Sequence, residues 1–172
     1  MNINDVNGDC ERLSADIVRI ASQRGLAVST AESCTAGMVA SFIGDVPGAS
    51  AVLLGGAITY CDAIKHRVLG VPSSTLRECT AVSAQTARAM ARGSRELFGS
   101  DIAVSVTGYA GPGGGTDDDP VGTVYIGLDS ESGSTVERFT FEGGRSAVRL
   151  QSACAALRLI ADELGDDGAL KG

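Results

Sequence analysis

The chain has 172 residues, of which 44% are hydrophobic and 20% charged, a length and balance that suit one soluble globular domain and exclude a second large one. Fourteen basic side chains against twenty-one acidic ones give a formal net charge of −7, the wrong sign for a protein that binds phosphate backbones, so nucleic acid is not an expected partner. Glycine is over-represented at 23 residues, which requires a structural or functional reason.

The start of the chain, MNINDVNGDCERL, lacks the basic region followed by an apolar stretch that marks a signal peptide, so we expect a cytoplasmic location. The longest interior stretch without charge, residues 46–61, is too short for a membrane span and is interrupted by proline and glycine. The five cysteines are odd in number and show no CxxC spacing, which favours reduced, mostly buried thiols over a disulfide framework or a zinc site.

Helices and strands are predicted from the spacing of apolar residues and from the glycine, proline and capping residues between them. In chain order, the prediction is helix 11–24, strand 26–30, helix 33–43, strand 52–60, helix 62–69, a short helical turn 72–78, helix 83–98, strand 102–107, strands 121–128 and 135–141, and helix 146–164. Residues 1–9 and 165–172 are predicted to be loose tails, so the prediction is a single domain over 1–172 with its core at about 11–164.

Strands alternate with helices early in the chain and pair as a hairpin late. This order predicts an α/β fold of three layers, α/β/α, in which a mixed, mainly parallel sheet ends in a β-hairpin and a C-terminal helix. If helical crossovers make the first three strands parallel, their carboxyl ends share one edge of the sheet, and the hairpin returns the chain to that edge. Because ligands of open α/β sheets bind at the carboxyl edge, the polar residues that follow these strands are the candidate site residues.

Ser33 lies at the predicted junction between the first strand and the second helix. Free backbone N–H groups and the positive end of the helix dipole at such a junction favour developing negative charge, which a nucleophile with its oxyanion hole requires. On this segment alone, a helix cap formed by Ser33 or Thr35 is the stronger explanation. The segment is not the GxSxG elbow of hydrolases, because Glu32 takes the place of the glycine.

A serine nucleophile needs a base, and the candidates are the chain's one histidine, His66, and its neighbour Lys65. Adjacent residues of a helix point to different sides, so only one of them can face the site. A lysine acts as a base only where burial or nearby cations lower its pKa, whereas most helical lysines are solvated surface charges. Tyr60 is either a proton relay that orients this lysine or a half-buried aromatic at a strand end.

Residues 108–115 include five glycines, which let backbone amides approach a ligand closely. This glycine loop lacks the Gly-Lys-Ser/Thr ending of a Walker loop and the GxGxxG pattern of dinucleotide folds, so no nucleotide cofactor is predicted. The run of three aspartates at 117–119 is interpreted as a solvated surface, and no metal site is predicted.

The start of the last helix carries a candidate anion site. Gly143, Gly144 and Arg145 combine free N–H groups, the helix dipole and a guanidinium, which together can bind phosphate or carboxylate. Arg149, one turn further on, is a candidate second donor. An ordinary helix start with surface arginines is the alternative for this segment.

Five motifs occur in this order along the chain: AESCTAG, AITYCDAIK, SVTGYAGPGGG, DPVGTVY and FEGGRSAVR. Together they resemble the C-terminal domain of the CinA (competence/damage-inducible protein) family over about residues 13–160. Members of this kind resemble nicotinamide-nucleotide amidases, which implies hydrolysis of the carboxamide of nicotinamide mononucleotide to nicotinate mononucleotide and ammonia, without a metal or another cofactor. Longer members carry an additional N-terminal domain, so the chain is similar to the stand-alone amidase form.

The resemblance also implies roles for individual residues. Ser33 would be the nucleophile, Lys65 and Tyr60 would activate it, and Arg145 would hold the phosphate. The start of the second helix and the glycine loop would form the oxyanion hole. The residues implied to contact substrate are Glu32, Thr35, Thr107, Gly108, Ala110, Gly111, Gly113, Gly114 and Arg145. A small-molecule nucleotide is then the expected partner, with homodimer formation as a further expectation.

Three positions depart from the family pattern. Ala36 stands where glycine is common, a change expected to be harmless on a helix. Asp119 stands where lysine is frequent, and Tyr109 stands where an aliphatic residue is usual. These last two favour an alternative function, that of a non-catalytic nucleotide-binding or regulatory domain. A second alternative is an amidase in which the thiol of Cys34 is the nucleophile.

Overall fold

The computed structural model describes residues 3–166, which form one five-stranded sheet with helices on both faces. In chain order the elements are α1 (Ile3–Arg24), β1 (Val28–Glu32), α2 (Met38–Gly44), the short 3-10 helix η1 (Ala49–Ala51), β2 (Leu53–Ile58), α3 (Asp62–Leu69), α4 (Ser73–Cys79), α5 (Ala84–Phe98), β3 (Ile102–Gly108), β4 (Thr123–Ser130), β5 (Gly133–Thr140) and α6 (Arg145–Asp166).

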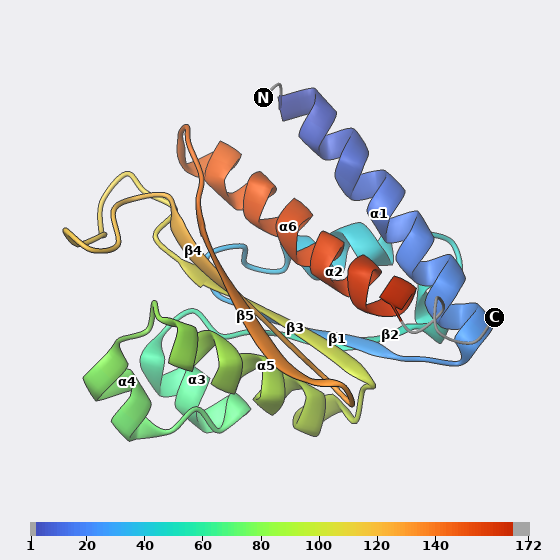
Figure 1. Ribbon diagram of the computed structural model, residues 1–172, viewed down its shortest axis with the longest axis horizontal. Helices are drawn as coiled ribbons and strands as arrows, with labels where there is room; N and C mark the ends of the chain where they lie inside the picture. Colours follow the sequence, from blue (N-terminus) through green and yellow to red (C-terminus); the bar gives the residue numbers. More distant parts are fainter. Residues whose placement is uncertain (1–2, 167–172) are drawn as a thin grey trace.

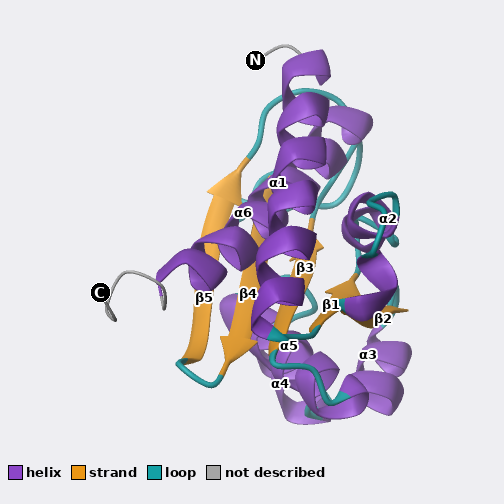
Figure 2. Ribbon diagram, turned by 90° about the vertical axis from the view of Figure 1, so that its right-hand side faces the viewer, coloured by secondary structure: helices purple, strands orange, loops and turns teal. Residues whose placement is uncertain are grey.

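The strands are ordered β2-β1-β3-β4-β5 across the sheet, as Figure 2 shows. β1 pairs in parallel with β2 and β3, whereas β4 is antiparallel to both β3 and β5. Helices α1, α2 and α6 lie on one face of the sheet, and α3, α4 and α5 lie on the other (Figure 1). The predicted α/β/α layers, mixed sheet, terminal hairpin and C-terminal helix are therefore confirmed.

The strand register brings the carboxyl ends of β1, β2 and β3 to one edge. Glu32, the last residue of β1, pairs with Ile58 of β2 and with Val106 of β3. The pairing continues one residue further, because the Thr59 N–H donates to the Glu32 carbonyl at 2.8 Å and the Ser33 N–H donates to the Val106 carbonyl at 2.9 Å. The residues that follow the three strands are thus fixed side by side by backbone hydrogen bonds.

The main core lies between the sheet and the α1–α6 layer. Every residue of β1 is buried, because the central strands have helices on both faces. Ile17 of α1 and Leu157 and Ile160 of α6 are completely buried, and each such side chain contributes about 1.5 to 3 kcal/mol through removal from water. Within residues 3–166, none of the helices is long and apolar enough to cross a membrane.

The predicted N-terminal tail is wrong for residues 3–9. α1 begins at Ile3, eight residues before the predicted start, because Val6 and Cys10 continue the apolar face of the helix and are 3% and 0% exposed. At the other end, α6 extends to Asp166, two residues beyond the predicted end of this helix at residue 164. The rest of the predicted C-terminal tail, residues 167–172, lies outside the described residues.

The predicted start of the second helix is also wrong. α2 begins at Met38, and residues 33–37 form a turn between β1 and this helix. Within the turn, Ala36 has φ +53° and Gly37 has φ +93°, both in the left-handed region. The expectation that alanine at position 36 is harmless on a helix is therefore incorrect, because a side chain in this conformation costs about 1 to 2 kcal/mol.

We predict that Ala36→Gly raises the free energy of unfolding by about 1 kcal/mol, because glycine removes the cost of the left-handed backbone. Little packing is lost, since Ala36 is exposed. Urea denaturation measures the change. The matched control is Ala15→Gly, at an exposed position inside α1, which should lower the free energy of unfolding by about 1 kcal/mol. Equal destabilisation by both substitutions would contradict the strain assigned to Ala36.

Candidate active site

A pocket of 210 Å³ opens at the carboxyl edge of the parallel strands. It is lined by residues from several separate segments of the chain, most of which follow a strand or precede a helix. These residues are Ser33, Cys34, Tyr60, Lys65, Ala81, Val82, Thr107, Gly108, Tyr109, Ala110, Gly111, Gly113 and Arg145. Most of the residues predicted to form the site are thus brought together in one place.

Ser33 is positioned by the sheet and not by a helix. It follows β1 directly, and its N–H donates to the Val106 carbonyl of β3. The Ser33 hydroxyl is half-buried in the pocket and accepts a hydrogen bond from Lys65 Nζ at 2.9 Å. The expected placement at the first turn of a helix is incorrect, since α2 begins five residues later, at Met38.

Lys65 is buried beneath this hydroxyl, with 1% of its surface exposed. Its Nζ donates to the Ser33 Oγ and, at 2.7 Å, to the Thr59 carbonyl. Burial lowers the pKa of the Lys65 amine from the ordinary value of 10.5, and the charge of Asp62 opposes this shift. None of the ion pairs among the described residues includes Lys65.

The choice between Lys65 and His66 follows from their positions on α3. His66 is exposed, and its Nδ1 lies 2.8 Å from the Val71 carbonyl, outside the pocket. Only Lys65 contacts Ser33. An amine whose pKa is lowered by burial loses its proton more readily and can then take the proton of an adjacent hydroxyl, so this pair has the arrangement that a serine nucleophile with a lysine base requires.

Glu32 has a structural role instead of the expected contact with substrate. Its carboxylate is 1% exposed and accepts hydrogen bonds from the backbone N–H groups of Gly37, Val39 and Ala40, at 2.8, 3.2 and 2.9 Å. These are the N–H groups at the start of α2 that would otherwise have no partner in the helix. The expected contribution of this helix start to an oxyanion hole is therefore incorrect.

Tyr60 and Arg145 meet at the exposed rim of the pocket. Arg145 Nη2 donates to the Tyr60 hydroxyl at 2.7 Å, and Nη1 donates to the Gly111 carbonyl at 2.8 Å. The guanidinium therefore links the residues after β2, the glycine loop and the start of α6. Among the described residues, Tyr60 makes no hydrogen bond with Lys65, so its expected role as a proton relay to that lysine has no support in the geometry.

The glycine loop forms the opposite wall of the pocket. Ala110 is 4% exposed, and no acceptor among residues 3–166 is bonded to the backbone N–H groups of Ala110 and Gly111. The Thr107 hydroxyl donates to the Ala81 carbonyl at 2.7 Å. Gly114 was expected to contact substrate, but it lies outside the pocket lining, against the ring of Tyr109.

Two further expectations about polar residues differ from the structure. Thr35 is completely buried and is not part of the pocket lining. Arg149 donates to the carbonyls of Cys34 and Thr35, at 3.0 and 2.8 Å, and so fixes the turn after Ser33. Both are structural residues here, and the suggested second anion donor at Arg149 is engaged with the backbone.

Cys34 lines the pocket next to Ser33 but is poorly suited to nucleophilic attack. Its side chain is 5% exposed. Burial raises the pKa of the Cys34 thiol to about 11, so the group is protonated at neutral pH, and the thiolate is the reactive form of a cysteine.

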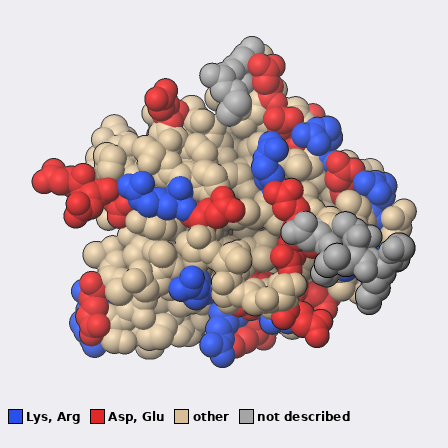
Figure 3. All heavy atoms as spheres, in the orientation of Figure 1, with Lys and Arg blue, Asp and Glu red and all other residues tan. Residues whose placement is uncertain are grey.

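Asp119 is paired outside the pocket. Its carboxylate accepts hydrogen bonds from Arg138 Nε of β5 at 3.0 Å and from the Tyr125 hydroxyl of β4 at 3.1 Å. Acidic and basic side chains accordingly lie next to one another at the protruding loop on the left of Figure 3. The carboxylate of Asp119, at the position where lysine is frequent in the family, is thus paired with Arg138. This ion pair connects the segment after the glycine loop to β5.

Two features of the site were missed in the sequence. Ala81 and Val82 line the pocket, and the preceding Thr80 has φ +68°, a strained value for a residue with a side chain.

Gly93, in the middle of α5, lets α3 pack directly on the α5 backbone, since a Cβ at this position would lie 1.9 Å from the Leu69 carbonyl. A glycine inside a predicted helix was the available signal for such close packing.

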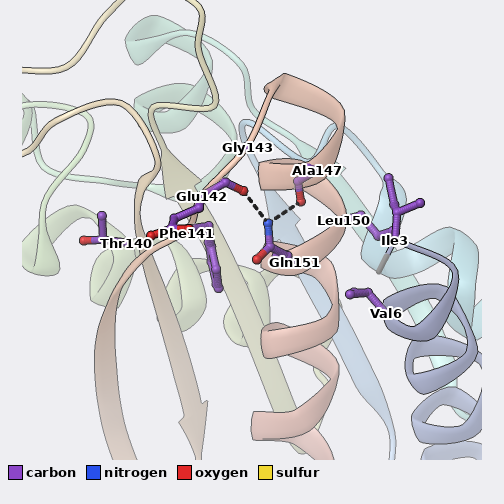
Figure 4. A pocket seen from close by; sticks show the side chains of 9 residues that line it. All are labelled: Ile3, Val6, Thr140, Phe141, Glu142, Gly143, Ala147, Leu150 and Gln151. Atoms are coloured by element: carbon purple, nitrogen blue, oxygen red, sulfur yellow. Dashed lines mark hydrogen bonds between the residues drawn. The ribbon is translucent and has the colours of Figure 1, made fainter. Parts of the chain in front are cut away.

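A larger pocket of 530 Å³ lies between β5, α6 and the start of α1. Figure 4 shows its lining, which includes apolar side chains such as Phe141 and Leu150 but lacks a serine, cysteine or lysine. Within the described residues, no group of three or more His, Cys, Asp or Glu side chains is placed to hold a metal ion. The smaller pocket, which holds a serine hydroxyl bonded to a buried lysine amine, is therefore the candidate active site.

Comparison with known proteins identifies the family. The CinA C-terminal domain matches residues 10–164. A CinA-like protein of Geobacter sulfurreducens is 50% identical over 141 residues, 82% of this chain and 34% of that protein, and one of Myxococcus xanthus is 43% identical over 157 residues, 91% of this chain and 37% of that protein.

Solved structures show the same fold. The competence/damage inducible protein CihA of Agrobacterium tumefaciens is 38% identical with a TM-score of 0.88, covering 91% of this chain and 96% of that one. A CinA superfamily protein of Klebsiella pneumoniae is 33% identical with a TM-score of 0.87, covering 91% and 98%. The chain belongs to the CinA family, and it spans a little over a third of the length of the curated relatives that it matches.

We predict that Gly93→Ala lowers the free energy of unfolding by about 1 to 3 kcal/mol, because the methyl group forces α3 away from α5. The control is Gly8→Ala, at a glycine inside α1 where an added methyl group would have nothing within 4 Å, and this change should raise the free energy of unfolding by about 1 kcal/mol. Thermal and urea unfolding measure both. A neutral Gly93→Ala variant would contradict the close contact.

Proposed function

We propose that this member of the CinA family is an amidohydrolase that converts nicotinamide mononucleotide to nicotinate mononucleotide and ammonia. The observation that carries the proposal is the 2.9 Å contact between Ser33 Oγ and the Nζ of a completely buried lysine, Lys65. The substrate is inferred from the five sequence motifs, because they resemble those of nicotinamide-nucleotide amidases.

The proposed reaction begins with proton transfer within this pair. Neutral Lys65 takes the Ser33 proton as the oxygen attacks the carboxamide carbon, and the carbonyl oxygen becomes an oxyanion. The backbone N–H groups of Ala110 and Gly111 are the proposed donors to that oxyanion, in place of the start of α2, which Glu32 occupies. Collapse breaks the C–N bond, and Lys65 returns the proton to the departing ammonia.

The second half of the reaction uses the same groups. Water donates a proton to Lys65 as its oxygen attacks the ester formed on Ser33, and a second oxyanion forms at the same position. Its collapse releases the carboxylic acid, the proton on Lys65 returns to the serine oxygen, and the acid then loses its proton to become the carboxylate. The net change is amide plus water to carboxylate plus ammonia, which takes up a proton in solution.

The shape of the pocket favours a substrate whose reacting end is small. A volume of 210 Å³ is below the roughly 300 to 1,000 Å³ of pockets that enclose a drug-sized ligand, so the pocket suits the pyridine carboxamide while the ribose phosphate extends to the rim. Arg145 lies at that rim, with Tyr60 beside it. Exchange of its bonds to Tyr60 and Gly111 for bonds to phosphate would give a charge-assisted contact.

Two alternatives are weaker on these observations. The raised pKa of the Cys34 thiol, and the donation of the Lys65 amine to the Ser33 hydroxyl and the Thr59 carbonyl, support Ser33 as the nucleophile. A non-catalytic binding domain was suggested by Asp119 and Tyr109. Because Asp119 is paired with Arg138, only Tyr109 still favours this alternative. Tight nucleotide binding with slow or absent turnover would support it.

We predict that Ser33→Ala and Lys65→Ala each lower kcat for ammonia release from nicotinamide mononucleotide by about 1,000-fold or more, because each removes a group that takes part in bond formation or proton transfer. Ammonia is measured with a chelator present. Ser41→Ala, at an exposed position on α2, is the control and should retain full activity. Full activity of both pocket variants would overturn the mechanism, and an inactive wild type would overturn the substrate.

The rate should rise with pH as the Lys65 ammonium loses its proton. Since burial lowers this pKa, we expect kcat/KM to rise through a one-proton step with its midpoint below 10.5, and then to level off. The chain has two lysines, so nuclear magnetic resonance of lysine-labelled protein can follow Lys65 directly, with Lys171 as the second signal. Midpoints that differ between the two measurements would exclude Lys65 as the base.

We predict that Arg145→Gln raises KM for nicotinamide mononucleotide by about 10- to 100-fold, because a charge-assisted contact to phosphate is lost. KM for nicotinamide riboside, which lacks the phosphate, should change little. Arg92→Gln, at an exposed ion pair on α5, controls for loss of positive charge. An equal increase for both substrates would show that Arg145 acts on the pocket and not on the phosphate.

A further inference from the structure

Two thiols from opposite ends of the chain meet outside the candidate active site. Cys10 belongs to α1 and Cys154 belongs to α6, and these helices lie side by side over one face of the sheet (Figures 1 and 2). Cys10 is completely buried and Cys154 is 8% exposed. Both are free thiols in the structure.

Contacts of neighbouring residues place the two cysteines at the same level of the helix pair. One turn earlier, Val6 and Leu150 point into the space between the two helices, as Figure 4 shows. Beside them, Oδ2 of Asp9, the residue before Cys10, lies 4.0 Å from Nη2 of Arg158, one turn after Cys154. Cys10 and Cys154, each one turn after Val6 and Leu150, belong to the same buried core cluster, and each thiol influences the pKa of the other. The two thiols are therefore neighbours in the buried interface between α1 and α6.

The surroundings make the two thiols chemically unequal. Interaction with the Cys10 thiol, together with the charge of Arg158, lowers the pKa of the Cys154 thiol, against the opposing effects of burial and of Asp9. The same interaction and burial raise the pKa of the Cys10 thiol. Arg158 lies one turn after Cys154 on α6 and its charge favours a thiolate there, so Cys154 is the candidate attacking cysteine and Cys10 the candidate resolving one.

We propose that Cys10 and Cys154 form a peroxide-sensitive pair that closes to an intramolecular disulfide between α1 and α6. In the first step, the Cys154 thiolate attacks hydrogen peroxide, the O–O bond breaks, and the sulfur becomes a sulfenic acid while hydroxide takes up a proton to form water. In the second step, Cys10 sulfur attacks the sulfenic sulfur, its proton leaves with the hydroxyl as water, and the S–S bond forms. One peroxide is reduced and two thiols are oxidised.

This disulfide would differ from the all-thiol state expected from the cysteine count. It would close a loop that contains most of the chain, from the first helix to the last, and so restrict the unfolded state strongly. Unfolding of the oxidised protein should therefore require a higher temperature than unfolding of the reduced protein. The other cysteines do not offer this pairing, since Cys61 is exposed and Cys34 lines the active-site pocket.

The test treats the folded, reduced full-length chain with hydrogen peroxide at neutral pH and then alkylates it under denaturing conditions. We expect the oxidised product to be a monomer that is lighter by two hydrogen atoms, with three of its five cysteines alkylated, and peptide mapping should find Cys10 linked to Cys154. Dithiothreitol should restore five alkylated cysteines and the lower melting temperature.

Variants separate this pair from the other thiols. Cys10→Ala and Cys154→Ala should each abolish the intramolecular link, whereas Cys61→Ala and Cys79→Ala should form it at the rate of the wild type. Arg158→Gln, at an exposed position, should slow the reaction at neutral pH and regain the wild-type rate at alkaline pH, where the Cys154 thiol ionises without the arginine. Circular dichroism of each reduced variant verifies that it is folded.

Several results would overturn the proposal. Five alkylated cysteines after peroxide treatment would exclude the reaction. Oxidation of Cys154 to a sulfinic acid without a link to Cys10 would show that the second thiol does not resolve the first. Links through Cys61 between two chains, in place of the internal link, would assign the peroxide sensitivity to an exposed thiol.

Discussion

Burial of the Lys65 amine without a carboxylate partner among the described ion pairs is the constraint on which the site depends. A charged ammonium removed from water is costly, so burial favours the neutral form that can take a proton. The sheet supplies the two oxygen atoms that the amine requires, because Ser33 directly follows β1 and Thr59 directly follows the neighbouring β2. The contact between Lys65 and Ser33 thus depends on the register of β1 and β2 and on the position of Lys65 in the first turn of α3.

The parts of this arrangement that follow from local pattern could be predicted from the sequence. The bounds of α3 agree with the prediction, and Gly70 ends this helix in the left-handed conformation as expected. The shared edge of the first three strands follows from the rule for parallel crossovers. Helix geometry predicts that only one of Lys65 and His66 faces the site. It does not predict which one, since either side of α3 could have faced the sheet. The resemblance to the CinA family selected Lys65, and the geometry agrees.

The errors arose where polar residues bind the protein's own backbone. Glu32 and Arg149 carry charges that suit a substrate, but in the folded chain Glu32 caps α2 and Arg149 fixes the turn after Ser33. Residue type gives the chemistry of a side chain, whereas its partner is set by tertiary packing. The start of α2 was missed for the same reason, because the left-handed backbone at Ala36 depends on that turn and not on local helix propensity.

The placement of Lys65 on a helix of eight residues has a consequence for how the protein responds to heat. α3 packs mainly on α5 and is separate from the main core between the sheet and α1 and α6. Short peripheral segments open at lower free energy than the global transition. Each opening of α3 would return the amine to water, where it regains its proton. Thermal inactivation would then begin while the sheet and its larger helices are still folded.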